Sequence, residues 1–234
     1  MRYELHYWPE IQGRGEFVRL ALEEGGADYL DVARRRGGTD AMMKYLGDAV
    51  AARPPYAPPI LRAGKLVIAQ TALILYYLAP RLGLGPRGEA GRLWAHQLQL
   101  TITDFVKEIH DTHHPISNGL YYEEQRREAR KYTTEFWRRR VPKYLGYFER
   151  ALGRGPYVFG RKLSYVDLSL FQIVDGLRYA FPRRMKREAT TFPKLAALHD
   201  LVMERSRIAA YLNSERRIAF NEWGIFRHYN ELDR

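Results

Sequence analysis

The sequence predicts an α/β domain followed by an all-α domain, and two observations support this division. Before residue 83, short runs typical of strands alternate with helical repeats, in the order strand, helix, strand, helix, strand, strand, helix. Beyond residue 88, the apolar residues recur at helical spacing. We therefore expect an α/β domain over residues 1–82, a glycine- and proline-rich linker over 83–88, and an all-α domain over 89–234.

A strand, a loop and a helix open the chain. Residues 3–7 alternate between apolar and polar side chains, and an apolar i, i+3, i+4 repeat begins at Phe17 and ends before Gly25. Residues 28–32 alternate again, so the two strands should be parallel and joined by a right-handed crossover. Ligands of open α/β sheets bind at the carboxyl ends of the parallel strands, which is where Tyr7 falls.

Four further elements complete the α/β domain. We expect a short helix over residues 39–46, and then a proline cluster at 54–59 that excludes helix. A hairpin follows over residues 60–68, with a glycine-containing turn. An apolar helix over 72–78 should be stopped by Pro80. This order of elements is that of a thioredoxin-like domain.

Composition excludes several classes of site and partner. The 234 residues include no cysteine, so a disulfide, a thiolate metal site and a cysteine nucleophile are excluded. The longest charge-free run, residues 66–80, is shorter than the roughly 18 residues that a membrane helix needs. The net charge is +11, but the basic runs are scattered among glutamates without a nucleic-acid motif. We expect a soluble cytoplasmic protein that binds neither membranes nor nucleic acid.

A combination of short motifs resembles a known family. The motifs are Tyr7-Trp8-Pro9 at the end of the first strand, Gly13-Arg14 in the next loop, Pro59 before the third strand and Gln70-Thr71 at the head of the third helix. With them, nearly the whole chain resembles a cytosolic glutathione S-transferase of the tyrosine type, the group of the alpha, mu, pi and sigma kinds. The serine and cysteine types are disfavoured, because residues 1–62 contain no serine and the chain has no cysteine.

The resemblance implies a reaction and a catalytic residue. A thiol with an ordinary pKa near 8.5 is mostly unreactive at neutral pH, and the thiolate is the nucleophile. A neutral Tyr7 hydroxyl that donates to the glutathione sulfur, helped by the first helix and by Arg14, would favour the thiolate. The expected activity is conjugation of glutathione, as co-substrate, to a hydrophobic electrophile. The resemblance implies no other cofactor.

The resemblance also implies a set of binding residues. Those expected to contact glutathione are Tyr7, Arg14, Lys44, Pro58, Pro59, Gln70, Thr71 and Asp104. Gln70 and Thr71 would hold the γ-glutamyl end, and Lys44 the glycyl carboxylate. Asp104 would reach the γ-glutamyl end from the other subunit, so a homodimer is expected. The electrophile pocket is expected to contain Trp8, Ile11, Phe105 and His110.

The proline cluster departs from the family pattern at one point. In the family, the residue before a cis-proline offers both its N–H and its C=O to glutathione. Either Pro59 is cis here, and Pro58 has no N–H to offer, or Pro58 is cis and Ala57 supplies both groups. The length of the hairpin favours a cis Pro59.

The second domain shows the sequence signals of several helices. A long helix carries an apolar stripe from Trp94 to Ile109, a second helix over 123–152 should be kinked at Pro142, and a last short helix covers 208–212. Another helix should begin with a capping box, in which Ser164 caps the helix and the Asp167 side chain accepts the Ser164 N–H.

His110, His113 and His114 are candidate metal ligands by residue type. However, no H-E-x-x-H spacing is present and the resemblance implies no metal, so no metal is expected.

Two other functions remain open, since fold alone does not establish activity. They are a noncatalytic transferase-like binding module and a glutathione-dependent isomerase or peroxidase.

Overall fold

A computed structural model describes residues 1–47 and 53–234, and the chain forms two compact units. The first unit contains residues 1–97 together with 205–219, and the second contains 98–204 together with 220–234. The domain boundaries expected from the sequence, at residues 82 and 89, stay a prediction.

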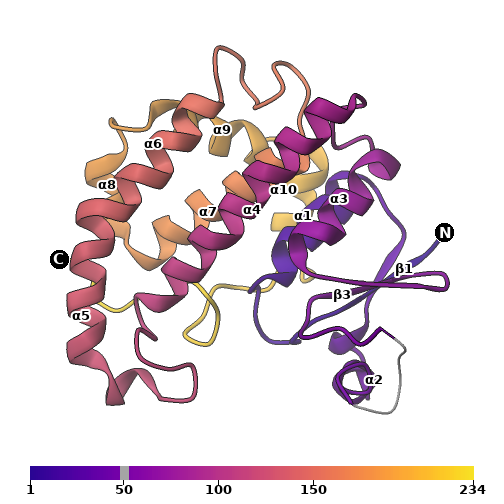
Figure 1. Ribbon diagram of the computed structural model, residues 1–234, viewed down its shortest axis with the longest axis horizontal. Coiled ribbons are helices and arrows are strands. Elements are labelled where there is room, and N and C mark those ends of the chain that lie inside the picture. Colours follow the sequence, from indigo (N-terminus) through magenta and orange to yellow (C-terminus); the bar gives the residue numbers. More distant parts are fainter. Residues whose placement is uncertain (48–52) are drawn as a thin grey trace. The chain divides into compact units, whose positions relative to one another are not determined.

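The first unit contains a mixed sheet and the helices that cover it (Figure 1). Its elements are β1 (Tyr3–His6), α1 (Gly15–Glu24), β2 (Tyr29–Asp31), η1 (Val32–Arg34), α2 (Gly38–Met43), β3 (Ile60–Ala63), β4 (Leu66–Ala69), α3 (Thr71–Leu82) and α10 (Ser206–Leu212). The four-stranded sheet has the order β2-β1-β3-β4, with β1 parallel to β2 and antiparallel to β3. The predicted element order, the parallel crossover and the hairpin are confirmed.

The alternation of β1 explains how the sheet is covered. Leu5, on one face, belongs to a core cluster with Val18 of α1, Leu61 of β3 and Ile74 of α3, so α1 and α3 pack on that face. His6 points to the opposite face, where its ring contacts the ring of Tyr45 just after α2. Figure 1 shows α2 across the strands from α1 and α3.

Two predicted helix ends differ from the structure. Pro80 does not stop α3, which continues to Leu82 and ends at Gly83. A proline in the last turn removes one helical N–H but leaves the following residues free to stay helical. Gly83 has a φ of +69°, and the Leu84 N–H bonds to the Ala79 carbonyl, so the left-handed glycine ends the helix.

The short helix α2 ends at Met43, earlier than the expected residue 46. The next two residues form tighter turns, with the Tyr45 and Leu46 N–H groups bonded to the carbonyls three positions back. The expected end therefore falls in irregular turns that follow the helix.

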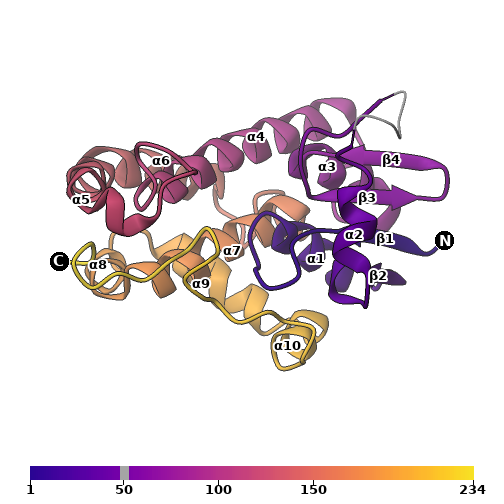
Figure 2. The same ribbon diagram turned by 90° about the horizontal axis from the view of Figure 1, so that it is seen from below.

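The second unit is helical. Its elements are the greater part of α4 (Glu89–Asp111), η2 (Tyr122–Glu124), α5 (Arg126–Glu135), η3 (Phe136–Arg140), α6 (Val141–Ala151), α7 (Tyr165–Ala180), α8 (Pro182–Glu188) and α9 (Pro193–Met203). Figure 2 shows α7 beside α9 in this unit. The predicted second helix is divided by the wide π-helical turn η3, which ends two residues before Pro142. Among the described residues, no helix is long and apolar enough to cross a membrane.

The predicted capping box begins α7. The Ser164 N–H and hydroxyl both bond to one oxygen of the Asp167 carboxylate, at 2.7 and 2.6 Å, and the other oxygen accepts the Val158 N–H. Burial raises the pKa of Asp167 to about 6, although these hydrogen bonds oppose the rise. The box therefore fixes both the helix start and the preceding loop.

Candidate functional site

Three strand ends meet at one edge of the sheet. His6, the last residue of β1, pairs with Ile60, the first residue of β3, and Ile60 pairs with Ala69, the last residue of β4. Tyr7 directly follows His6, Pro59 directly precedes Ile60, and Gln70 directly follows Ala69. Because neighbouring strands lie about 4.8 Å apart, this register places the three motifs of the sequence side by side.

Tyr7 is enclosed by the loop that leads into α1. Its hydroxyl oxygen accepts the Arg14 N–H at 2.8 Å. A Cβ on Gly13 would lie 2.2 Å from that oxygen, and a Cβ on Gly15 would lie 2.6 Å from the tyrosine ring. Only glycine fits at these two positions, since any larger side chain would displace the tyrosine.

The hydrogen bond determines what the Tyr7 hydroxyl can do. Its oxygen already accepts a bond, so its proton is available for donation to an acceptor. Burial raises the pKa of Tyr7, while the Arg14 N–H and the charges of Arg14 and Arg19 oppose the rise. At neutral pH the group is therefore a protonated donor, not a base.

A buried ion network, which was not predicted from the sequence, supports the same loop. Arg19 is fully buried and bonds to the carboxylates of Glu16 at 3.2 Å and Asp31 at 2.7 Å. Glu16 also accepts the Tyr211 hydroxyl at 2.7 Å and a short bond from Arg217. The i, i+3 spacing of Glu16 and Arg19 was a visible signal for the pair, but their burial and distant partners were not visible.

The start of α3 has the features of an anion site. Gln70, just before the helix, has φ +70° and ψ 118°, which is strained for a residue with a side chain. Thr71 is buried, and its hydroxyl has no hydrogen-bond partner among the described residues. The free N–H groups and positive dipole of the first turn favour a carboxylate here.

The peptide between Pro58 and Pro59 is cis, so the alternative with a cis Pro58 is wrong. Pro58 is half-buried and Pro59 is buried directly before β3. Pro58 can therefore offer a carbonyl at this edge but no N–H.

The remaining predicted site residues divide between the two units. In the first unit, Trp8 is 39% exposed, Ile11 and Arg14 are half-buried, and Lys44 is exposed at the end of α2. In the second unit, Asp104, Phe105 and His110 all lie on α4.

The three residues on α4 differ in burial. Asp104 is exposed, whereas His110 is half-buried. Phe105 is fully buried and stacks on the ring of Tyr144 at 4.4 Å and on the ring of Phe136 at 5.8 Å. Phe105 thus packs in the core of its unit, and its predicted place in the electrophile pocket stays a prediction.

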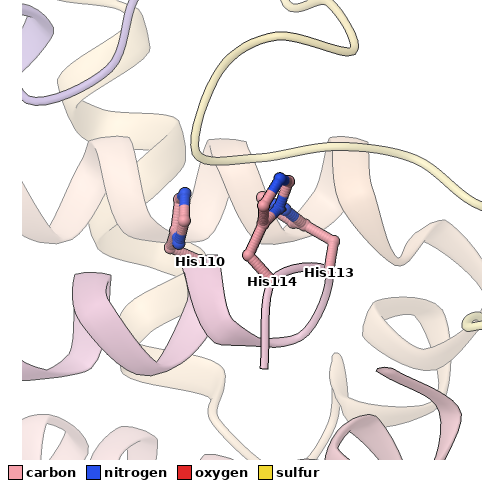
Figure 3. A group of neighbouring side chains, drawn as sticks. All are labelled: His110, His113 and His114. Atoms are coloured by element: carbon pink, nitrogen blue, oxygen red, sulfur yellow. The ribbon is translucent and has the colours of Figure 1, made fainter. Parts of the chain in front are cut away.

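The histidine cluster at the end of α4, His110 on the helix and His113 and His114 just after it, is closely packed (Figure 3). One ligand atom from each of His110, His113 and His114 lies within 4.8 Å of the others. The Nδ1 atoms of His113 and His114 are 2.5 Å apart, and His113 Nε2 is 2.8 Å from the Ile225 carbonyl oxygen.

Comparisons with known proteins agree with these features. A family model described as the C-terminal domain of glutathione S-transferase matches residues 110–215. A glutathione S-transferase of Plasmodium falciparum is 24% identical over 219 residues, which cover 90% of this chain and 95% of the relative. The class-mu 26 kDa isozyme 51 of Fasciola hepatica is 25% identical over 231 residues, with 95% and 94% covered.

A solved structure shows the same architecture. The pi-class glutathione S-transferase of Onchocerca volvulus superposes with a TM-score of 0.71 at 20% identity, over 94% of this chain and 99% of that chain. The predicted fold, a thioredoxin-like domain plus a helical domain, is thereby confirmed. The family model and the relatives thus make this chain similar to glutathione S-transferases over most of its length.

Proposed function

We propose that this protein is a tyrosine-type glutathione S-transferase, in which Tyr7 stabilises the thiolate of glutathione for attack on a hydrophobic electrophile. The observation that carries the proposal is the Tyr7 hydroxyl, which accepts the Arg14 N–H and keeps its own proton for the sulfur. Donation to the thiolate favours the charged sulfur and lowers the pKa of the thiol. The amino end of α1 adds a positive dipole near the same place.

The γ-glutamyl end of glutathione would bind at the start of α3. The Thr71 hydroxyl is buried without a partner, and a carboxylate would satisfy it together with the Thr71 N–H. The side chain of Gln70 is exposed directly beside it. The Pro58 carbonyl would accept one N–H of the cysteinyl part, Arg14 would favour the thiolate by its charge, and Lys44 would bind the glycyl carboxylate.

The other parts of the proposal concern the second substrate and the assembly. For the electrophile we propose contacts with Trp8 and Ile11, which lie close to Tyr7 in the chain, and with His110 of the second unit, whereas fully buried Phe105 would shape such a site from the core of its unit. Exposed Asp104 would bind the γ-glutamyl end of glutathione in the partner subunit of a homodimer. We propose a cytoplasmic location.

The test compares tyrosine variants at opposite ends of β1, where Tyr3 begins the strand and Tyr7 directly follows it. Tyr7→Phe should still bind a glutathione affinity resin but conjugate a generic aromatic electrophile about ten- to a thousandfold more slowly, the scale for removing one donor to an anion. Tyr3→Phe is the matched control, because Tyr3 is also buried but lies at the opposite end of β1. Equal rates for the two variants near neutral pH would refute the role of Tyr7.

The wild-type protein also separates the two alternatives. Glutathione binding without any turnover would favour a noncatalytic module. Turnover of a peroxide or of an isomerisable substrate, faster than conjugation, would favour the specialised enzyme, which uses the same thiolate.

A further inference from the structure

The three histidines share one face of a helical turn. The N–H groups of His113 and His114 both bond to the His110 carbonyl at 3.2 Å, so a helical turn continues past the end of α4. Residues at i, i+3 and i+4 of such a turn are neighbours on one face. Figure 3 shows the imidazoles of His113 and His114 in contact, with that of His110 beside them.

One hydrogen bond determines which nitrogen of His113 is free. The Ile225 carbonyl, 2.8 Å from Nε2, can only accept, so Nε2 carries the proton and Nδ1 has a lone pair. That lone pair points at His114 Nδ1, 2.5 Å away. A backbone carbonyl that fixes the tautomer in this way is the usual outer partner of a metal-binding histidine.

We propose that His110, His113 and His114 bind a divalent transition-metal ion of the zinc type, with a water molecule at the fourth position. Three imidazoles with an open position are an established ligand set for zinc. The three histidines belong to the second unit and the sheet edge with Tyr7 to the first, and nothing in the family model or in the names of the relatives assigns a metal to these histidines.

The distances require only side-chain rotation. Zinc–nitrogen bonds of about 2.0–2.1 Å in a tetrahedron place the nitrogens about 3.3 Å apart. His113 and His114 must therefore separate slightly, and His110, whose nitrogen lies within 4.8 Å, must turn inward. His110 is 18% exposed in its side chain, which leaves a path for the ion.

Charge and protonation also fit a metal. His113 and His114 are both buried, and the neutral imidazole is the form that binds a metal. The positive charge of Arg227 acts on both histidines and would oppose a cation, whereas the negative charges of Asp111 and Glu123 act on His114 and would favour one. Without metal, His114 Nδ1–H donates to His113 Nδ1; a metal bound at His114 Nδ1 would replace this bond, and the proton would then be carried by His114 Nε2.

The experiment measures zinc binding to the tag-free chain without glutathione, so its result is independent of the proposed catalysis. After treatment with a chelator, the protein is titrated with Zn²⁺ against a chromogenic competitor, and with Co²⁺ to record the visible absorption of a tetrahedral site. Wild type should bind one equivalent of each ion and unfold at a higher temperature with zinc.

A matched pair of variants identifies the ligands. His110→Gln removes a half-buried ligand with little risk to folding, and it should weaken zinc binding at least about tenfold, because loss of an outer-shell partner alone costs 10–100-fold. His96→Gln, a half-buried histidine elsewhere on α4, should bind as wild type. Absence of a one-equivalent site in wild type, or equal weakening by both variants, would overturn the proposal.

Discussion

Gly13 is the position where a single methyl group should disable the proposed site. Gly13 has a φ of +47°, and an added Cβ would lie 2.2 Å from the Tyr7 hydroxyl oxygen and 2.7 Å from a ring carbon. A real contact of this kind needs more than 3 Å, so in Gly13→Ala the tyrosine must move by about an ångström. The Arg14 N–H then loses its acceptor.

The cost of Gly13→Ala has two parts. The left-handed backbone costs roughly 1–2 kcal/mol for a residue with a Cβ. The lost hydrogen bond costs about 0.5–1.5 kcal/mol more. Since the hydroxyl no longer reaches the sulfur, we expect conjugation to slow by about ten- to a thousandfold, as in Tyr7→Phe.

Gly83→Ala is the matched control for this effect. Gly83 also has a positive φ, +69°, but its Cβ would meet no atom of residues 1–47 or 53–234 within 4 Å. It should therefore lose only the backbone part of the stability and keep full activity. Urea unfolding and initial conjugation rates on both variants test this difference. If Gly13→Ala were as active as Gly83→Ala, the enclosed tyrosine would not be the catalytic donor.

Three further predictions concern stability. Ser164→Ala should lower the free energy of unfolding by about 0.5–2 kcal/mol, measured by urea denaturation, without changing conjugation. The pKa of Asp167 is about 6 in the folded state and about 3.9 in the unfolded state, so the folded state binds this proton more tightly. The resulting gain in the free energy of unfolding is fully present below about pH 4 and is lost by about pH 7. At about 1.4 kcal/mol per unit this fall is about 3 kcal/mol, and denaturation curves of Asp167→Asn should lack it. Arg19→Met leaves the buried carboxylate of Glu16 with fewer partners and should cost about 3–5 kcal/mol in the same assay, whereas Arg62→Met, at an exposed ion pair, should cost under about 1 kcal/mol.

Local patterns predicted the elements whose causes are local. The capping box at Ser164 and Asp167 was visible because both partners lie within one turn. The register of the hairpin was visible because its turn is short, and it favoured Pro59 over Pro58 as the cis residue. The predicted end of α3 was wrong, because Gly83 and not Pro80 ends the helix.

The backbone of Gln70 and the burial of Glu16 were not predictable in the same way. A glutamine gives no local sign of a φ of +70°, because that conformation depends on the chain entering α3 from β4. Glu16 lies in the first turn of α1, where an acidic side chain ordinarily faces water and stabilises the helix by its interaction with the helix dipole. Its partners Tyr211 and Arg217 lie 195 and 201 residues further along the chain.

These distant partners have a consequence for the loop around Tyr7. Arg19 bonds to the Gln12 carbonyl at 3.3 Å, and the Gln12 side chain donates to the Ile218 carbonyl at 2.5 Å. The segment 205–219 belongs to the same compact unit as the sheet. The loop that gives Tyr7 its N–H donor is therefore held from both sides, by the start of α1 and by a segment from the far end of the chain. Because a donor must be placed within a fraction of an ångström to stabilise an anion, this anchoring gives residues 205–219 a direct part in positioning the proposed site.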